Sequence, residues 1–330
     1  MTYKDRVYGE SEIDNPLILE LIQAPSIQRL KGIDQRGYFE PYFPGTDFSR
    51  FEHSLGVYLL LKKYKTSFEE QVAGLIHDVS HSAFSHCIDY VLETGSEKEQ
   101  SHQDSIFKDF VRKTEIPLIL QKHGVDVDYI LNETNFPLKE KDLPDICADR
   151  IDYSLRTAIV FQEISEKDVN SILDTLSTKN NYWIFNDLES AKNFAQLFFR
   201  LNSLYYAGLV TAIMFATVKD YLRYALKNNY VNKDDLYTTD KEVLEKVGKY
   251  LERDKELKFL FDKMNNRVEI ENNPKDFDIN ILVKSRAIDP LCKYNGEIKK
   301  ISEIDKSWGE IVKKESKPKE YFIKFKKFKK

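Results

Sequence analysis

The stretch "GLIHDVSHSAFSH" at residues 74–86 places three of the chain's six histidines, His77, His81 and His86, within ten residues. An acid, Asp78, directly follows the first of them. The apolar run "VAGLI" just before this doublet predicts a helix buried against a core. A buried acid and imidazole are costly unless they are paired or bound to an ion. The stretch therefore predicts a helical body built around a polar centre.

The composition is that of a globular chain rich in helices. Apolar residues make up 42% of the 330 residues, and the 12 glycines and 10 prolines are few for this length. The net charge of -4 is too small to favour nucleic acid or a membrane as the default partner. The three cysteines form no CxxC pair, so neither a disulfide framework nor a zinc ribbon is indicated.

The N-terminus shows no apolar core of the kind that a signal peptide needs. The longest apolar stretch, "AGLVTAIMFATV", is well short of the roughly 20 residues required to span a bilayer. We therefore expect a cytoplasmic protein that does not enter a membrane.

Apolar residues at helical spacing predict most elements of the first two thirds of the chain. Pro25 is expected to open a second helix. Ser67 is expected to cap a helix that continues through His81, with Glu70 completing a capping box. On that helix His77 and His81, four residues apart, would share one face. The predicted helices cover residues 17–31, 51–64, 67–84, 102–113, 142–160 and 190–228.

From Asn229 the sequence changes character. Residues 240–265 predict a charged helical pair, and alternating runs within 268–294 predict strands. The chain therefore divides into a helical body, 1–228, and a smaller mixed α+β part, 229–330, with no obvious flexible linker between them. The fold class is mainly α.

The tail "KKESKPKEYFIKFKKFKK", residues 313–330, carries nine lysines against two glutamates. Tyr321, Ile323 and Phe325 alternate with other residues, which predicts an edge strand protected by lysines. The alternative is an electrostatic arm for nucleic acid or an acidic partner, whose binding would fall steeply with added salt.

Two residues distant from the doublet complete a candidate metal set. His53 lies in "RFEHSLG" and Asp149 in "ICADRIDYSLR", each within an amphipathic helical segment. Together with His77 and Asp78 they offer imidazole nitrogens and carboxylate oxygens, which suit zinc, iron, manganese or magnesium. Four ligands from three helical segments would leave coordination positions open for water and substrate.

The ordered set of these four residues resembles the H…HD…D signature of the HD-domain metal-dependent phosphohydrolases. The similarity is greater to the deoxynucleoside triphosphate triphosphohydrolase branch, which includes the SAM-and-HD-domain proteins, and no SAM domain accompanies it. The resemblance implies an HD-domain helical bundle that holds one or two divalent ions for the attack of water on phosphorus. The similar segments are "IQRLKGIDQRG", "YFPGTDFSRFEHSLGVYLL", "AGLIHDVSHSAFSH", "DRIDYSLR" and, more weakly, "FFRLNSLYY" and "RAIDPLCKYNG".

The resemblance also implies catalytic roles. His81, His86 and His102 match further active-site histidines of the family, one of which would protonate the leaving oxygen. Asp89, three residues after His86, would orient an imidazole and raise its proton affinity.

Substrate contacts are implied in the same way. Gln35 matches a glutamine that contacts the sugar, and Tyr153 a tyrosine that contacts the nucleotide. Arg50 and Arg150 would neutralise phosphate oxygens with their guanidinium groups. The alternatives are a core aromatic for Tyr153 and an ordinary surface ion pair for Arg150.

Several positions depart from the family pattern. Thr157 replaces an acid associated with the ribose, and Leu201, Tyr205 and Leu209 stand where arginine, histidine and tyrosine are expected. These losses weaken the case for holding a γ-phosphate, because charged hydrogen bonds are the strong ones. Gln23 replaces an acid that reads guanine in nucleotide-activated relatives, so we expect no activation of that kind.

The sequence predicts a metal-dependent phosphohydrolase whose partner is a nucleotide substrate. The leading reaction is cleavage of a (deoxy)nucleoside triphosphate to nucleoside and triphosphate. One alternative is a phosphatase or phosphodiesterase acting on nucleoside monophosphates, cyclic nucleotides or nucleic-acid ends. Another is a nucleotide sensor without turnover. A homo-oligomer is a further expectation, with residues 240–265 as its interface.

Overall fold

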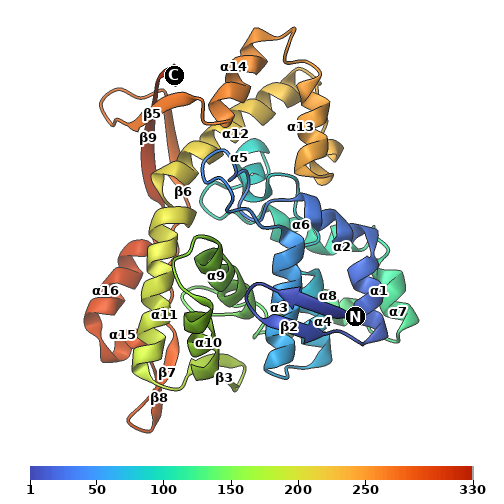
Figure 1. Cartoon of the computed structure of the whole chain (residues 1–330), viewed down its shortest axis with the longest axis vertical. Helices are drawn as coiled ribbons and strands as arrows, with labels where there is room; N and C mark the ends of the chain where they lie inside the picture. The colour runs from blue at the N-terminus through green and yellow to red at the C-terminus, as the bar shows by residue number, and fades with distance from the viewer. Residues whose placement is uncertain (329–330) are drawn as a thin grey trace.

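The computed structural model describes residues 1–328, with side chains to residue 326. Sixteen α-helices, five short 3-10 or π-helical turns and nine strands make up this part of the chain, so the mainly helical class is confirmed (Figure 1). The helices are α1 Pro16–Gln23, α2 Pro25–Arg29, α3 Arg50–Lys63, α4 Phe68–Ile76, α5 Ile88–Val91, α6 His102–Val111, α7 Ile116–Lys122, α8 Val127–Leu131, α9 Ala148–Val160, α10 Glu166–Thr175, α11 Leu188–Leu201, α12 Leu209–Lys227, α13 Asp240–Gly248, α14 Lys255–Met264, α15 Ile301–Ile304 and α16 Lys306–Glu315. The strands are β1 Thr2–Asp5, β2 Gly9–Glu12, β3 Leu176–Lys179, β4 Tyr182–Phe185, β5 Val268–Asn272, β6 Ile279–Val283, β7 Leu291–Tyr294, β8 Glu297–Lys300 and β9 Lys319–Phe328.

Helix α3 lies at the centre of the body and packs against α4 and α9. Ser49 caps it in a capping box with Glu52, and eleven of its fourteen residues are buried. Gly56 faces α9 so closely that a Cβ there would lie 2.0 Å from Arg156 and 2.1 Å from Asp152. Only glycine allows these two helices to approach with the buried Asp152–Arg156 ion pair between them.

Helix α4 differs from its prediction at both ends. Ser67 does cap it by accepting from the Glu70 N–H, but the Glu70 carboxylate accepts from the N–H groups of Leu138 and Lys139 instead of closing a capping box. The helix ends at Ile76. The prediction that it continues through His81 is therefore wrong. Residues 78–85 contain one aspartate and three serines, and both residue types favour turns over helix interiors.

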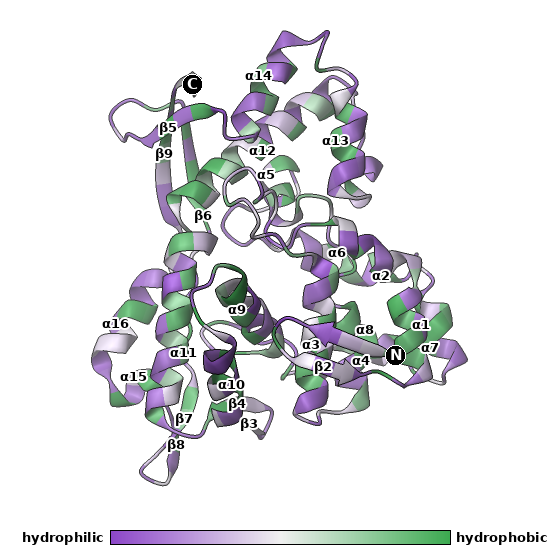
Figure 2. Cartoon of the chain, viewed as in Figure 1, coloured by the Kyte–Doolittle hydropathy of each residue, from purple (hydrophilic) through white to green (hydrophobic). Residues whose placement is uncertain are grey.

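Helices α11 and α12 follow each other through the core and are separated by a π-helical turn, Asn202–Tyr206, where the sequence predicted one helix (Figure 1). By length and composition, residues Leu188–Lys227 would suffice to cross a membrane, yet 67% of the apolar window is buried inside the protein. That burial is typical of a core helix. In Figure 2 these helices alternate hydrophobic and hydrophilic bands, whereas the outlying α13 is largely hydrophilic.

The strands form three small sheets, and two of them join distant parts of the chain. One sheet has the order β3-β4-β7-β8, in which β7 runs parallel to β4. The other has the order β5-β9-β6 and packs on α12. Residues after 229 thus pair directly with the helical body, while the division of the chain near residue 228 stays a prediction.

Strand β9 corrects the prediction for the lysine-rich tail. It lies in the middle of its sheet, paired antiparallel with β5 and β6, so it is not an edge strand. Tyr321, Ile323 and Phe325 pack in one apolar cluster with residues of α12. The apolar face of β9 is buried against α12, and both edges of the strand are paired. The lysine content of the tail alone does not distinguish such a central strand from an edge strand.

Candidate metal centre and active-site pocket

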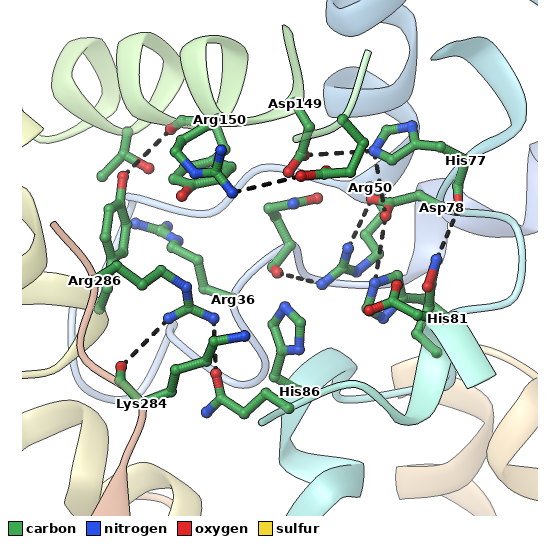
Figure 3. Close-up of a pocket in the computed structure, with 18 of the residues that line it drawn as sticks. Arg36, Arg50, His77, Asp78, His81, His86, Asp149, Arg150, Lys284 and Arg286 are labelled. Carbon is green, nitrogen blue, oxygen red and sulfur yellow. Dashed lines mark hydrogen bonds and ion pairs between the residues drawn. The ribbon is translucent and has the colours of Figure 1, made fainter. Parts of the chain in front are cut away.

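Three elements bring His53, His77 and Asp149 together. His53 lies in α3, His77 follows the last residue of α4, and Asp149 is the second residue of α9. The Nε2 atoms of the two histidines are 3.2 Å apart. Asp149 Oδ1 is 2.8 Å from the Nε2 of His53 and 3.5 Å from that of His77. Three of the predicted ligands therefore converge on one point (Figure 3).

Neighbouring groups fix which nitrogen each ring presents. The Nδ1–H of His53 donates to Asp152 at 2.7 Å, and the Nδ1–H of His77 donates to the carbonyl of Gly74 at 2.8 Å. With both rings neutral, the state that a metal ligand needs, each would direct an Nε2 lone pair toward the other ring and toward a carboxylate. This arrangement is unfavourable in itself and is relieved by a cation, because outer partners of this kind orient metal-bound histidines. The donor set thus fits a divalent cation.

The electrostatics agree with this assignment. Burial alone would lower the pKa of His53, but the hydrogen bonds with Asp149 and Asp152 outweigh it and raise that pKa to about 9. Burial would raise the pKa of Asp149, yet the hydrogen bonds of His53 and His77 hold it well below its usual range. The site therefore stabilises positive charge strongly, as a metal centre requires.

Asp78 lies beside this cluster. Its Oδ1 is 3.4 Å from His77 Nε2 and 3.3 Å from His81 Nε2, while its Oδ2 accepts from Arg50 Nη1 at 2.7 Å. Asp78 and Arg50 are both buried. Asp78 stays the predicted fourth ligand, with one oxygen near the donors and the other neutralised by Arg50.

His81 and His86 both line the pocket next to the metal donors. Their ring centroids are 5.2 Å apart. His77 and His81 do not share a helix face as predicted, since α4 has already ended, but a turn still brings both to Asp78. Burial lowers the pKa of both His81 and His86. The Nδ1 of His86 has no hydrogen-bond partner and lies 3.7 Å from Asp89 Oδ2.

The structure does not bring His102 to the pocket wall. Its Nε2 lies 2.9 Å from the Tyr237 hydroxyl, and its backbone N–H donates to Asp89 Oδ1 at 3.0 Å. Neither His102 nor Asp89 is among the residues that line the pocket. Direct contact of His102 with substrate is therefore not supported. Asp89 lies where it can orient His86 and anchor the start of α6, so its predicted positioning role fits.

The four predicted substrate contacts, Gln35, Arg50, Arg150 and Tyr153, all line a pocket of about 440 Å³. All three nitrogens of Arg50 are already engaged, by Asp78, by Ser85 and by the carbonyl of Gln35. Arg50 therefore positions Asp78 and is poorly placed to hold a phosphate alone. The Nη1 of Arg150 is also engaged, but its Nε has no partner.

The positions that departed from the family pattern divide into two groups. Thr157 and Tyr205 line the pocket, and the buried Thr157 hydroxyl has no hydrogen-bond partner. The Tyr205 hydroxyl donates to Glu163. Leu201 is fully buried in the core and does not line the pocket.

Five cationic residues that line the pocket were missed: Arg36, Lys139, Lys141, Lys284 and Arg286. Arg36 follows the predicted Gln35, and Lys284 and Arg286 lie in the segment that joins β6 to β7. The family-like segments "IQRLKGIDQRG" and "RAIDPLCKYNG" contain Arg36 and Arg286, but the sequence analysis assigned neither residue a role. Sequence could not show that chain segments some 250 residues apart line the same pocket.

Comparisons with known proteins address the same region. The model of the HD domain family matches residues 50–157, which contain all four predicted ligands. The chain is 33% identical over 291 residues to the uncharacterized protein YdhJ of Bacillus subtilis, covering 88% of each chain. It is 35% identical over 173 residues to the metal-dependent phosphohydrolase cns2 of Cordyceps militaris, covering 52% of this chain and 49% of cns2. It is 31% identical over 159 residues to the deoxynucleoside triphosphate triphosphohydrolase SAMHD1 of Mus musculus, covering 41% of this chain and 24% of SAMHD1.

Two solved structures share the fold. A hypothetical protein from Aquifex aeolicus superimposes with a TM-score of 0.75 at 20% identity, covering 98% of this chain and 96% of that one. A phosphohydrolase from Bacteroides thetaiotaomicron superimposes with a TM-score of 0.67 at 19% identity, covering 99% of this chain and 100% of that one. With the donor set in α3, α4 and α9 and the relatives above, these observations show that the chain belongs to the HD-domain metal-dependent phosphohydrolases.

Proposed function

We propose that the chain hydrolyses nucleotides, and that its leading substrates are (deoxy)nucleoside triphosphates, cleaved at the α-phosphorus to nucleoside and triphosphate. One observation carries this proposal: the metal donors and two histidines open onto a single polar pocket of about 440 Å³ that also holds several cationic side chains. That volume suits a small-molecule ligand of nucleotide size. Partial similarity to SAMHD1 supports the triphosphate as substrate.

The metal ligands and the residue that orients them have separate roles in this proposal. A divalent cation held by His53, His77, Asp149 and Asp78 would supply Lewis acidity toward water and phosphoryl oxygen. Asp152 keeps His53 in the tautomer that presents Nε2 to the site. In this proposal the scissile phosphorus would lie beside the donors.

His86 is the proton donor to the leaving oxygen in this proposal. Its Nδ1 is buried 3.7 Å from Asp89 Oδ2, so Nε2 is the nitrogen that would donate the proton. The side chain is 30% exposed and lines the pocket between the metal donors and the cationic residues (Figure 3). Burial lowers its pKa in the free protein. An anionic substrate beside the ring would raise that pKa again, because a nearby negative charge favours the imidazolium. His86 would thus become a competent acid once substrate is bound.

The test is a substrate screen with purified protein and manganese, magnesium, iron or zinc in turn. Chromatography that resolves nucleoside, phosphate and triphosphate should find nucleoside and intact triphosphate. His77→Ala should lose more than about a hundredfold in activity, since even outer-shell partners of metal ligands are worth 10–100-fold. Release of orthophosphate or of a nucleoside diphosphate would contradict cleavage at the α-phosphorus.

A second candidate is a phosphatase or phosphodiesterase of the same superfamily. The observation that favours it is local: Leu201 is buried in the core, the Tyr205 hydroxyl is bonded to Glu163, and neither side chain carries a positive charge that could hold a γ-phosphate. Activity confined to monophosphates or diesters in the same screen would support this candidate. Tight nucleotide binding without turnover under every metal would instead support a sensor.

A further inference from the structure

We propose that Arg36, Lys284 and Arg286 form a second anion-binding site, at the end of the pocket away from the metal donors, for the distal phosphates of a polyphosphate substrate. The proposal rests on the proposed function in one respect, because it takes the scissile phosphorus to lie at the metal donors. It assigns to a C-terminal segment the phosphate contacts that the sequence pattern had suggested were lost.

Arg36 is a buried guanidinium without an anionic partner. Its Nη2 donates to the carbonyl of Thr46, while its Nε and Nη1 make no hydrogen bond. It is 7% exposed and lies 4.2 Å from the Phe39 ring and 4.7 Å from the Phe161 ring. No carboxylate forms an ion pair with it within the described residues. A buried charge in this state is costly, so an anion that reached these donors from the pocket would find them already desolvated.

Lys284 and Arg286 are held by neutral acceptors. Lys284 Nζ donates to the carbonyl of Glu99 at 2.6 Å, and Arg286 Nη2 donates to the side-chain oxygen of Gln100 at 2.8 Å. In residues 1–326 neither side chain forms an ion pair with a carboxylate. Burial, followed by the neighbouring Arg286 charge, lowers the pKa of Lys284 to about 8. The excess of positive charge that lowers this pKa would be relieved by an anion.

The arrangement separates two ends of one pocket. In the view of Figure 3, Arg36, Lys284 and Arg286 gather on the left, His77 and Asp78 lie on the right, and His86 lies between them. A ligand with one phosphate at the metal donors and further phosphates at the cations would satisfy both ends. A monophosphate would leave the cationic end unfilled. We therefore expect ligands that carry more than one phosphate group to bind more tightly than a monophosphate.

The first test measures binding of inorganic tripolyphosphate to the metal-loaded protein by calorimetry. Lys284→Met and Arg286→Gln should each weaken binding about tenfold, because charge-assisted hydrogen bonds to phosphate are strong. Lys293→Met is the matched control: Lys293 is an exposed lysine in β7 that donates to Asn186, and its loss should leave binding unchanged. Metal content and melting temperature are measured for each variant, so that loss of metal or of folding is recognised.

Kinetics provide the second arm. Arg286→Gln should raise KM about tenfold for a nucleoside triphosphate and leave KM for a nucleoside monophosphate unchanged. Equal binding of tripolyphosphate by wild type and by both pocket variants would overturn the inference, whichever nucleotide the protein hydrolyses. If the protein hydrolyses no nucleotide but both variants still bind tripolyphosphate more weakly than the wild type, the proposed function fails and the anion site stands.

Discussion

Asp152 connects the metal centre to the interior of the protein. Its side chain is fully buried, accepts from His53 Nδ1, and pairs with Arg156, which in turn reaches Asp5. A carboxylate in this position fixes the ring of His53 and increases its basicity as a ligand. The chain of contacts explains why Gly56 must let α3 approach α9 closely.

We expect Asp152→Asn to lower metal affinity by about 10–100-fold, because an amide cannot hold the His53 ring with the same charge. Competition with a chelator, followed by metal analysis, measures the change. Asp174→Asn, at an exposed position of α10, is the control and should bind metal like the wild type. Unchanged affinity in Asp152→Asn would contradict an orienting role for Asp152.

Asp240 supplies a prediction about pH. This half-buried acid accepts from the N–H groups of Asp34 and Phe84 at 2.8 and 2.7 Å. Burial is the main cause that raises its pKa to about 8, from an ordinary value of 3.8. The folded protein therefore holds the proton more tightly than the unfolded chain, and stability from this group is lost as pH rises from about 4 to 8.

Asp240→Asn removes the titration and keeps a side chain of the same shape. Urea unfolding at pH 5 and pH 8 should show the variant gaining stability relative to the wild type as the pH increases. The substitution also disturbs one backbone hydrogen bond, but that cost is the same at both pH values. Parallel pH dependence of the two proteins would show that Asp240 does not titrate in this range.

At the scale of elements, β9 changes the expectation for the tail. Three of its lysines form ion pairs with nearby acids: Lys319 with Glu315 of α16, Lys324 with Asp276 between β5 and β6, and Lys326 with Glu271 of β5. The lysines of a free electrostatic arm would not be paired with acids of the same chain. Binding of nucleic acid through the tail stays a prediction, with less charge available than the composition suggests.

We therefore expect truncation after Pro318 to destabilise the protein, because it leaves β5 and β6 without the strand that joins them. Thermal unfolding should show a lower melting temperature and a tendency to aggregate through the exposed edges. Lys326→Gln, which removes only an exposed ion pair, should change stability by about 1 kcal/mol or less. A truncated protein that melts like the full chain would show that β9 is dispensable.

Elements determined by short-range sequence signals could be predicted, and those determined by distant contacts could not. The Ser67 cap, the Pro25 helix start and the helical pair at 240–265 follow from neighbouring residues and are confirmed. The carboxylate of Glu70 instead binds backbone 68 residues away. No local sequence pattern predicts such a distant partner. The central position of β9 was missed for the same reason, because its partners β5 and β6 lie far from it in the sequence.

At the scale of the whole molecule, one apolar cluster joins the body to the C-terminal part. Val57 and Leu60 of α3 belong to it together with Ile288, Cys292 and Trp308. The pairing of β7 with β4 continues this connection into a sheet. The metal donors were predictable because their order along the chain is a motif, whereas the cationic end of the pocket exists only after this long-range packing.

The separation of the two pocket ends along the chain has a consequence for how such proteins diversify. All four candidate ligands fall within residues 50–157, whereas Lys284 and Arg286 lie in a connecting segment more than a hundred residues later. Mutations in that connection can accumulate without touching the donors. If these two residues hold the distal phosphates, substrate preference can drift across a lineage while the hydrolytic chemistry is inherited intact.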